Sequence, residues 1–293
     1  MKIIDAHTHF YPDFVAKNPE EWANRMDELY WSKLVGKRPD GKLSLQGFPS
    51  EKRFLEDMDS AGIEKAIVQG WYWQHHKTCV EMNTQIAKFA NKYPDRIIGF
   101  ASISPAYYEE SLEEIKRAFE LGLCGIGELH DGVQGFDLLS EEFCEITNTA
   151  TKYNMPVCLH LTENNDRQYL GKTSTDNNSA YQLALRQPNA KFIFAHWSGL
   201  DAIAKADFTL PKNVFIDSAA TPLLCPNAWE VGIKNFPQQA IFGSDYPLRL
   251  YPRKFREPEL ATIVMDAKKN MQTGYAENFF SSNLEKFLSC ANR

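Results

Sequence analysis

Short apolar runs alternate with longer stretches of helical periodicity over most of this chain. The eight apolar runs lie at residues 3–10, 66–68, 97–101, 124–129, 157–161, 192–195, 214–216 and 240–242. Helices are expected at residues 51–61, 79–93, 107 onward, 140–153, 177–187, 228–236 and 258 onward. Strands separated by helices form parallel sheets, and eight strands close a (β/α)8 barrel. The pattern therefore predicts an α/β fold of the TIM-barrel type.

Two local signals refine this prediction. An open doubly wound sheet is the alternative fold, but no Gly-x-Gly-x-x-Gly follows the first run, so a dinucleotide-binding version lacks its fingerprint. In the helix expected from about residue 107, the spacing Ser111-x-x-Glu114 predicts a capping box at the helix start.

Residues 11–50 interrupt the alternation of runs and helices. The segment is rich in aromatic residues, and prolines and glycines break it at several positions. A connection this long in a compact domain is usually functional. We therefore expect a single barrel over residues 1–293, with residues 11–50 as a long loop or lid insertion after the first strand. A surface helix at residues 20–35 is the alternative.

The first apolar run carries a pair of histidines. On a strand, alternate side chains share a face, so Asp5, His7 and His9 are expected to point the same way. Two imidazoles at this spacing can hold one metal ion, but a metal site needs three or four converging ligands. The remaining ligands must come from other parts of the chain.

Polar side chains also stand at the ends of later runs, namely Glu128, His160, His196 and Asp245. Active sites of such barrels form at the C-terminal ends of the strands. Each residue also has an ordinary structural explanation: a surface carboxylate, a core histidine, a helix-capping group and a turn residue, respectively. Together they favour a metal site, because isolated buried charges are costly and one ion would satisfy all of them.

Composition limits the classes of partner. The 293 residues have 43% hydrophobic content and a net charge of −6, without a lysine or arginine cluster suited to a phosphate backbone. Nucleic acid is therefore not expected as a partner. A membrane is not expected either, since there is no apolar run of eighteen residues. Without a recognisable secretory signal, a cytoplasmic protein is expected. The oligomeric state stays open, with a homo-oligomer as one option.

The motifs together resemble the amidohydrolase superfamily. The matching stretches lie in order across the chain: Asp5-Ala6-His7-Thr8-His9, Val157-Cys158-Leu159-His160, Phe194-Ala195-His196-Trp197 and Phe242-Gly243-Ser244-Asp245-Tyr246-Pro247. They are most similar to the amidohydrolase-related group of metal-dependent hydrolases, lactonases and decarboxylases.

The resemblance implies a divalent ion held by His7, His9, His160 and Asp245. It implies that His196 orients water or substrate, or binds a second ion. Glu128 stands where two-metal relatives carry a bridging glutamate, so it is a further metal-ligand candidate. Zinc is the first expectation, with manganese, cobalt and iron as alternatives, and the number of ions is one or two.

The chemistry expected first is hydrolysis. A divalent ion lowers the pKa of bound water from about 15.7 towards about 7, and the resulting metal-bound hydroxide can attack an ester, lactone or amide carbonyl. In this scheme Asp245 takes the proton from the water, and His196 stabilises the oxyanion or steers the nucleophile. Metal-dependent decarboxylation of a small carboxylic acid is the main alternative, because the same ligands can serve it. A metal-binding or ligand-binding barrel without turnover is the second alternative.

Side chains on the loops after the strands suggest a small, acidic substrate. Arg249, Arg167 and Lys172 could pair with a carboxylate, and Trp71 could contact a flat ring. The alternative is that these exposed cations are merely solvated. Arg249 is the first choice and Arg167 the second.

Overall fold

The computed structural model describes residues 1–36, 44–163, 172–205, 207–221, 228–249, 259–271 and 274–288. All structural statements below concern these residues. Arg167, a predicted substrate contact, lies outside them.

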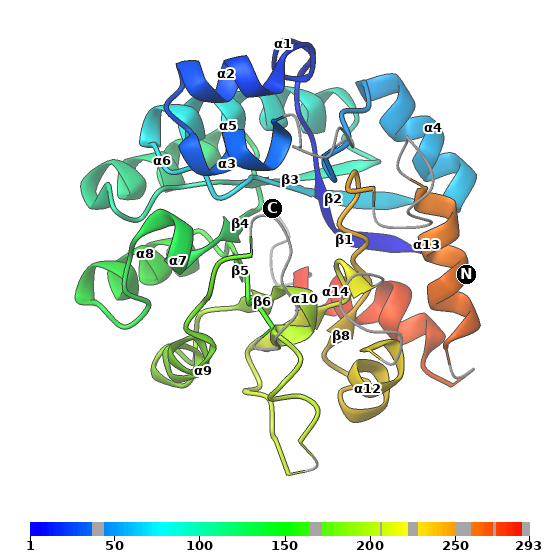
Figure 1. Ribbon diagram of the computed structural model, residues 1–293. Coiled ribbons are helices and arrows are strands. Elements are labelled where there is room, and N and C mark those ends of the chain that lie inside the picture. Colours follow the sequence, from blue (N-terminus) through cyan, green and yellow to red (C-terminus); the bar gives the residue numbers. More distant parts are fainter. Residues whose placement is uncertain are drawn as a thin grey trace.

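Eight parallel strands form one sheet in sequential order (Figure 1). The strands are β1 (Ile4–His9), β2 (Lys65–Gln69), β3 (Ile97–Ala101), β4 (Gly125–Leu129), β5 (Val157–Leu159), β6 (Phe192–Phe194), β7 (Val214–Asp217) and β8 (Ala240–Ile241). The backbone closes the ring, because the Ala6 N–H donates to the Phe242 carbonyl and the His9 N–H to the Tyr246 carbonyl, each at 2.7 Å. The fold is therefore the predicted (β/α)8 TIM barrel.

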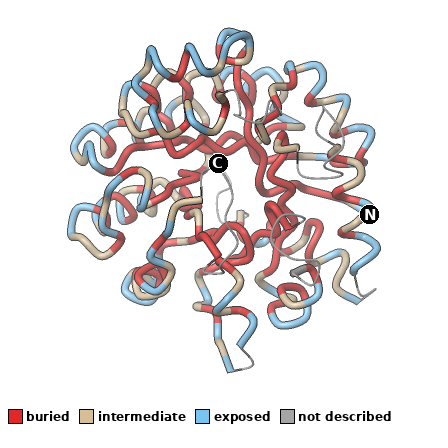
Figure 2. The backbone as a smooth tube through the Cα atoms, viewed as in Figure 1, coloured by how far each residue is buried: buried red, intermediate tan, exposed pale blue. Residues whose placement is uncertain are grey.

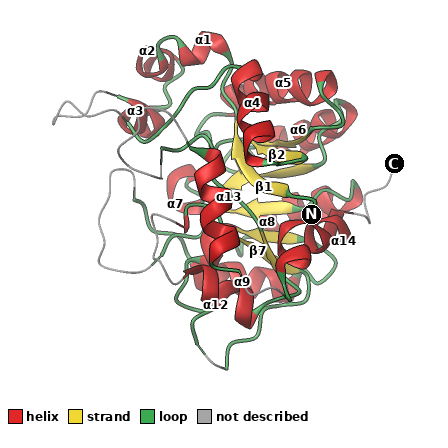
Figure 3. Cartoon of the chain, turned by 90° about the vertical axis from the view of Figure 1, so that its right-hand side faces the viewer, coloured by secondary structure: helices red, strands yellow, loops and turns green. Residues whose placement is uncertain are grey.

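Helices surround the strands (Figures 1 and 3). They are α1 (Asp13–Ala16), α2 (Pro19–Arg25), α3 (Leu29–Val35), α4 (Glu51–Ala61), α5 (His76–Lys92), α6 (Tyr108–Glu120), α7 (Asp131–Gln134), α8 (Glu141–Lys152), α9 (Asn177–Arg186), α10 (Ala195–Ser198), α12 (Ala228–Asn235), α13 (Leu260–Lys269), η1 (Asn278–Ser282) and α14 (Asn283–Leu288). None of the described helices has the length and apolar character needed to cross a membrane.

The apolar core has two layers that follow from the alternation of side chains along each strand. One cluster fills the inside of the barrel, with Ile67, Phe100 and Ile193 among its members, and Phe287 of α14 packs into it. A larger cluster lies between the strands and the surrounding helices. Figure 2 shows the same arrangement, with buried strands inside and exposed helix faces outside. The polar ends of the strands are therefore left at one rim of the barrel.

Strand β1 departs from simple alternation. Ile4 and Ala6 pack in the interior cluster, and the register with β2 shifts between Asp5 and Thr8. A bulge of this kind places two consecutive side chains on one face. The expectation that Asp5 shares a face with His7 is therefore wrong, although His7 and His9 do lie together.

The predicted capping box is also wrong. Helix α6 begins at Tyr108, so Ser111 is inside the helix, where its hydroxyl donates to the Ser104 carbonyl at 2.9 Å. The side chain of Glu114 instead pairs with Arg117 at 2.7 Å. The tertiary contacts of these two residues have displaced the local capping pattern.

Residues 13–35 form the three short helices α1, α2 and α3, which pack on the barrel through an aromatic cluster. Trp22 and Trp31 of these helices contact Trp73, which follows β2. Buried Glu28 accepts hydrogen bonds from the backbone N–H groups of Gln74 at 2.8 Å and His75 at 3.2 Å. This part of the segment is thus attached to the loop after β2.

Candidate metal centre

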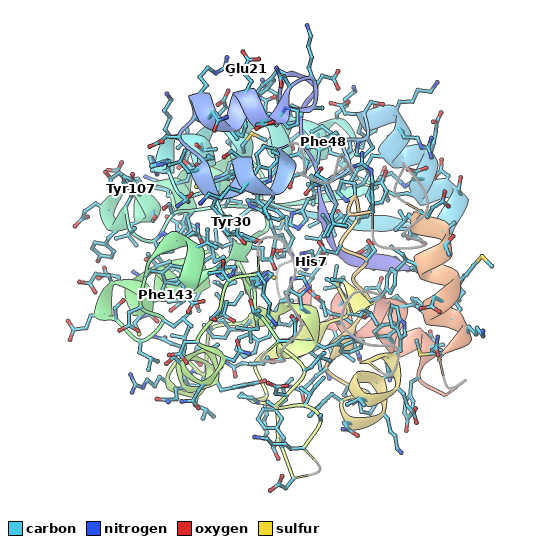
Figure 4. All side chains as sticks on the ribbon, viewed as in Figure 1. His7, Glu21, Tyr30, Phe48, Tyr107 and Phe143 are labelled. Carbon is cyan, nitrogen blue, oxygen red and sulfur yellow. The ribbon has the colours of Figure 1, made fainter. Side chains whose placement is uncertain are left out.

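The two histidines of β1 lie at the C-terminal rim of the barrel. Figure 4 shows His7 near the centre of the molecule in this view. The Nε2 atoms of His7 and His9 are 3.2 Å apart. Asp245, which follows β8, places its Oδ1 at 3.9 Å from His7 Nε2 and 3.5 Å from His9 Nε2. These three side chains are buried and form one group of potential metal ligands.

Glu128 of β4 joins this group to two further histidines. Its Oε2 lies 3.7 Å from His7 Nε2 and 3.9 Å from His9 Nε2. Its Oε1 lies 2.8 Å from His160 Nδ1 and 3.1 Å from His196 Nε2. All five predicted metal-ligand candidates therefore gather in one place, but His160 reaches the others through Glu128 and His196.

The spacing of these atoms suits a metal ion. Ligand bonds of about 2.1 Å place two ligand atoms about 3.0 Å apart at a right angle and about 3.4 Å apart in a tetrahedron. The Nε2 atoms of His7 and His9 are 3.2 Å apart, and the nearer oxygens of Glu128 and Asp245 lie 3.5–3.9 Å from these nitrogens, slightly wider than this. Two imidazoles and two carboxylates are also the donor set expected for zinc, manganese or iron.

The charges of the cluster shift its pKa values strongly. Burial lowers the pKa of His7, but the carboxylates of Asp217 and Glu128 outweigh burial and raise it to about 10. Burial works against ionisation of Glu128, yet the neighbouring His160 and His7 bring its pKa well below the usual range. The pKa of Asp245 is likewise lowered, against burial, by its hydrogen bond to His9 and by His7. The protein thus keeps anionic ligands ready for a cation.

His196 is held in an unusual backbone turn. His196, Trp197 and Ser198 all have positive φ, of 57°, 54° and 57°, in the left-handed region. Such a conformation costs roughly 1–2 kcal/mol per residue and must be stabilised by its surroundings. The Ala219 carbonyl lies 3.2 Å from His196 Nδ1, whereas His196 Nε2 lies 3.1 Å from Glu128 Oε1 and 3.0 Å from His160 Nδ1. Both nitrogens can therefore carry protons.

The pKa of His196 agrees with this geometry. Burial lowers the pKa, but the hydrogen bond to Glu128 and the charges of Glu128 and Asp245 raise it to about 9. These contacts favour the protonated form of the His196 ring.

Sequence reasoning missed two members of the site, Asp217 and His130. Asp217 ends β7, and its Oδ2 lies 2.8 Å from His7 Nδ1. The signal was available, because Asp217 follows an apolar run in the same way as the other candidates. His130 lies two residues after Glu128, and its ring stacks on His160 with centroids 4.6 Å apart. Burial, followed by the charge of His160, brings the pKa of His130 well below its usual value.

Of the predicted substrate contacts, one lies beside the ligand cluster and two contact other parts of the protein. Trp71 lies beside the site, with its ring 5.2 Å from the ring of His9 and stacked on Tyr72 at 4.3 Å. Arg249 uses Nη1 to donate to the backbone carbonyls of Ser44, at 2.9 Å, and Gln46. The Nζ of Lys172 lies 3.5 Å from Oε1 of buried Glu163. The two described cations thus have partners within the protein.

Comparison with known proteins gives one family. A sequence model described as "Amidohydrolase" matches residues 4–275. A search of curated protein sequences finds no match.

Several solved structures share the fold over nearly their whole length. A 5-carboxyvanillate decarboxylase from Novosphingobium aromaticivorans, with bound manganese and a nitrobenzoic acid, has a TM-score of 0.70 at 18% identity, over 98% of this chain and 97% of its own. A 2,6-dihydroxybenzoate decarboxylase from Rhizobium has a TM-score of 0.63 at 16% identity, over 100% of both chains. A probable 2-pyrone-4,6-dicarboxylic acid hydrolase from Acinetobacter baumannii has a TM-score of 0.65 at 12% identity, over 99% of this chain and 100% of its own.

Proposed function

This chain belongs to the amidohydrolase family, and we propose that it is a metal-dependent decarboxylase of a small carboxylic acid, with an aromatic acid as the first candidate. The observation that carries the proposal is the convergence of His7, His9, Glu128 and Asp245 beside the rings of Trp71 and Tyr72. The likeness to two decarboxylases of aromatic acids supports this chemistry over the hydrolysis that the motifs first suggested.

We assign the metal-holding role to His7, His9, Glu128 and Asp245, with His160 supporting Glu128. A divalent ion bound there would polarise a substrate oxygen and stabilise the negative charge that forms when carbon dioxide departs. Manganese is the first candidate, because two similar structures hold it, and zinc is the second.

The protein must also supply a proton. Decarboxylation breaks the bond between the substrate carbon and its carboxyl group; the electron pair stays on that carbon, which then takes a proton. We assign the donor role to His196, because both of its ring nitrogens face acceptors and its pKa is raised to about 9. Asp245, whose pKa is lowered, serves as the base that accepts a proton from a substrate hydroxyl group.

The surroundings suit a flat, acidic substrate. Tyr72 packs against both Trp71 and His160, with ring centroids 4.3 Å and 5.4 Å away. Aromatic rings pack favourably against such faces. Arg249, Lys172 and Arg167 remain proposed contacts for an acidic group. For Arg249 this role requires that the guanidinium serve both the substrate and the carbonyls it already contacts.

Hydrolysis of an ester, lactone or amide is the second candidate. The likeness to a probable dicarboxylic acid hydrolase supports it, and the same Asp245 and His196 would move the protons. A barrel that binds a ligand without turnover is the third.

Product analysis separates these candidates. Manganese-loaded protein is incubated in heavy water with hydroxylated benzoic acids, dicarboxylic acids and lactones. Decarboxylation releases bicarbonate and places one deuteron on the product carbon. Hydrolysis instead places oxygen-18 from labelled water in the product. If manganese binds and neither product forms from any compound, the binding-barrel alternative is favoured.

Asp245→Asn tests the assigned base. We expect turnover to fall by at least about 100-fold, because the amide cannot accept the substrate proton. Asp13→Asn, which changes an exposed carboxylate on α1, is the control and should keep wild-type turnover. Turnover of Asp245→Asn within tenfold of wild type would contradict the assignment.

A further inference from the structure

One buried carboxylate joins three strand ends of the site. Asp217 is fully buried, and its Oδ2 accepts a hydrogen bond from His7 Nδ1 at 2.8 Å. Its Oδ1 accepts from the backbone N–H of His196 at 3.1 Å and of Ala219 at 2.9 Å. Asp217 therefore connects a predicted ligand on β1 with the left-handed turn that carries His196, the proposed proton donor.

This arrangement determines which nitrogen of His7 faces the ligand cluster. An ionised carboxylate only accepts hydrogen bonds, so the proton of His7 lies on Nδ1. A metal ion binds only the neutral ring, and in that form the lone pair of His7 is on Nε2, the atom that lies 3.2 Å from His9 Nε2. Carboxylates that orient metal-binding histidines in this way are common outer partners of metal sites.

We propose that Asp217 is a positioning residue that presents Nε2 of His7 to the metal and fixes the backbone of His196 beside it. The proposal rests on the proposed function in assuming that an ion binds at the cluster. The proposal adds one carboxylate that fixes the position of the proton donor relative to the metal ligands.

The hydrogen-bond inventory explains why an aspartate is required at this position. Three N–H donors, from His7, His196 and Ala219, converge on the Asp217 side chain. An asparagine has the same shape but only one acceptor oxygen, and its other atom is a donor NH₂ group. Either way that the amide turns, at least one of the three N–H groups faces another donor. If the NH₂ group faces His7, it favours the wrong tautomer, with the proton on Nε2.

The first test measures manganese affinity of Asp217→Asn by calorimetric titration. We expect affinity about 10–100-fold weaker than wild type, the usual effect of losing an outer partner of a metal ligand. Ser218→Ala is the matched control, because Ser218 is the next residue and is equally buried, but its hydroxyl bonds Gly243 instead. This control should stay within about threefold of wild type. Wild-type affinity in Asp217→Asn would overturn the proposal.

Two readouts separate positioning from the simple loss of a negative charge. In zinc-saturated protein labelled with nitrogen-15 histidine, the wild-type His7 signal should show a proton on Nδ1, and Asp217→Asn should lose that signal. At saturating manganese, kcat should stay at least about tenfold reduced while KM changes little, because His196 has moved. If saturation restores kcat and the His7 signal is unchanged, only charge was lost and the proposal fails.

A crystal structure of metal-free Asp217→Asn makes the test independent of activity and of metal binding. We expect the His7 ring to rotate, or the His196 Cα to move by more than about 0.5 Å, the tolerance typical of functional sites. Unchanged positions would overturn the proposal even if the wild type bound no metal. Absence of metal binding or of turnover in the wild type, with these shifts present, would instead count against the proposed function.

Discussion

At the scale of single residues, the contacts of Glu128 bear on how many ions the proposed site would hold. Its Oε2 faces the His7 and His9 pair, whereas its Oε1 already lies within hydrogen-bond distance of His160 and His196. Hydrogen bonds from these two histidines would compete with a second ion for Oε1. On this ground we expect one ion per chain.

Elemental analysis checks this expectation. Wild-type protein should hold about one transition-metal ion per chain. The variant His7→Ala/His9→Ala should hold none, because two ligands are gone. Glu128→Gln should bind an ion at least about 10-fold more weakly, because a neutral amide is a poorer ligand than a carboxylate and also disturbs both histidine contacts. Two ions in wild type, with one lost in Glu128→Gln, would contradict a one-ion site and favour the hydrolase alternative.

At the scale of elements, the loops at the C-terminal rim are attached by polar side chains as well as by short backbone pairing, such as the antiparallel bridge between Gln46 and Leu248. Arg249 holds the segment at Ser44 and Gln46 against the loop after β8, and Glu28 holds α3 against the loop after β2. On the β5 side, helix α9 begins at the N-cap Asp176, whose carboxylate accepts from the Ser179 N–H at 3.0 Å. The N-terminal cap of α9 is therefore one of the polar contacts that stabilise the rim on the β5 side.

Asp176 gives a pH-dependent prediction. Hydrogen bonds from the Ser179 side chain and backbone lower the pKa of Asp176, so its ionised form stabilises the folded state. Asp176→Ala should lower the free energy of unfolding by about 1 kcal/mol at pH 7. This difference in the free energy of unfolding should persist above about pH 4, the usual pKa of an aspartate in an unfolded chain. It should shrink as the pH falls through the lower pKa that Asp176 has in the folded state.

Denaturant unfolding between pH 3 and pH 7 measures this effect. Asp176→Asn is the control, because asparagine also caps helices but does not titrate. Its difference from wild type should be small at pH 7. A loss in Asp176→Ala that stayed constant down to pH 3 would show that the charge of the cap does not contribute.

At the scale of the whole molecule, helix α14 near the C-terminus covers the end of the barrel opposite the candidate site. Phe287 of α14 packs into the interior cluster, with its ring 4.5 Å from that of Phe215 on β7. Figure 3 shows α14 near the N-terminal ends of the strands, away from α7 and α3. Stability and chemistry are thus placed at opposite ends of the barrel, as is usual in this fold.

Phe287→Ala should therefore destabilise the protein without altering the metal site. We expect a loss of about 3–5 kcal/mol in the free energy of unfolding, because the truncation leaves a cavity in the interior cluster. Manganese affinity of the folded protein should stay within about threefold of wild type. Phe14→Ala, at a side chain that is 44% exposed on α1, is the control and should cost little. Equal losses in the two variants would contradict this account of α14.

The sequence alone was enough for the fold and for most of the candidate site. Period-two and period-3.6 patterns are local properties, so eight strands and most helices could be placed within a few residues, and β3 and α4 in full. The rule that chemistry collects at strand ends then selected His7, His9, Glu128, His160, His196 and Asp245, which the structure brings together.

Only the tertiary structure decided how these residues are connected. The bulge in β1, the contact of Arg249 with backbone carbonyls, and the hydrogen bonds of Asp217 all join residues that are distant in sequence or depend on strand register. Local patterns carry no information on register or on which acceptor a donor finds. For that physical reason the sequence could name the ligand candidates, but not the carboxylate that orients them.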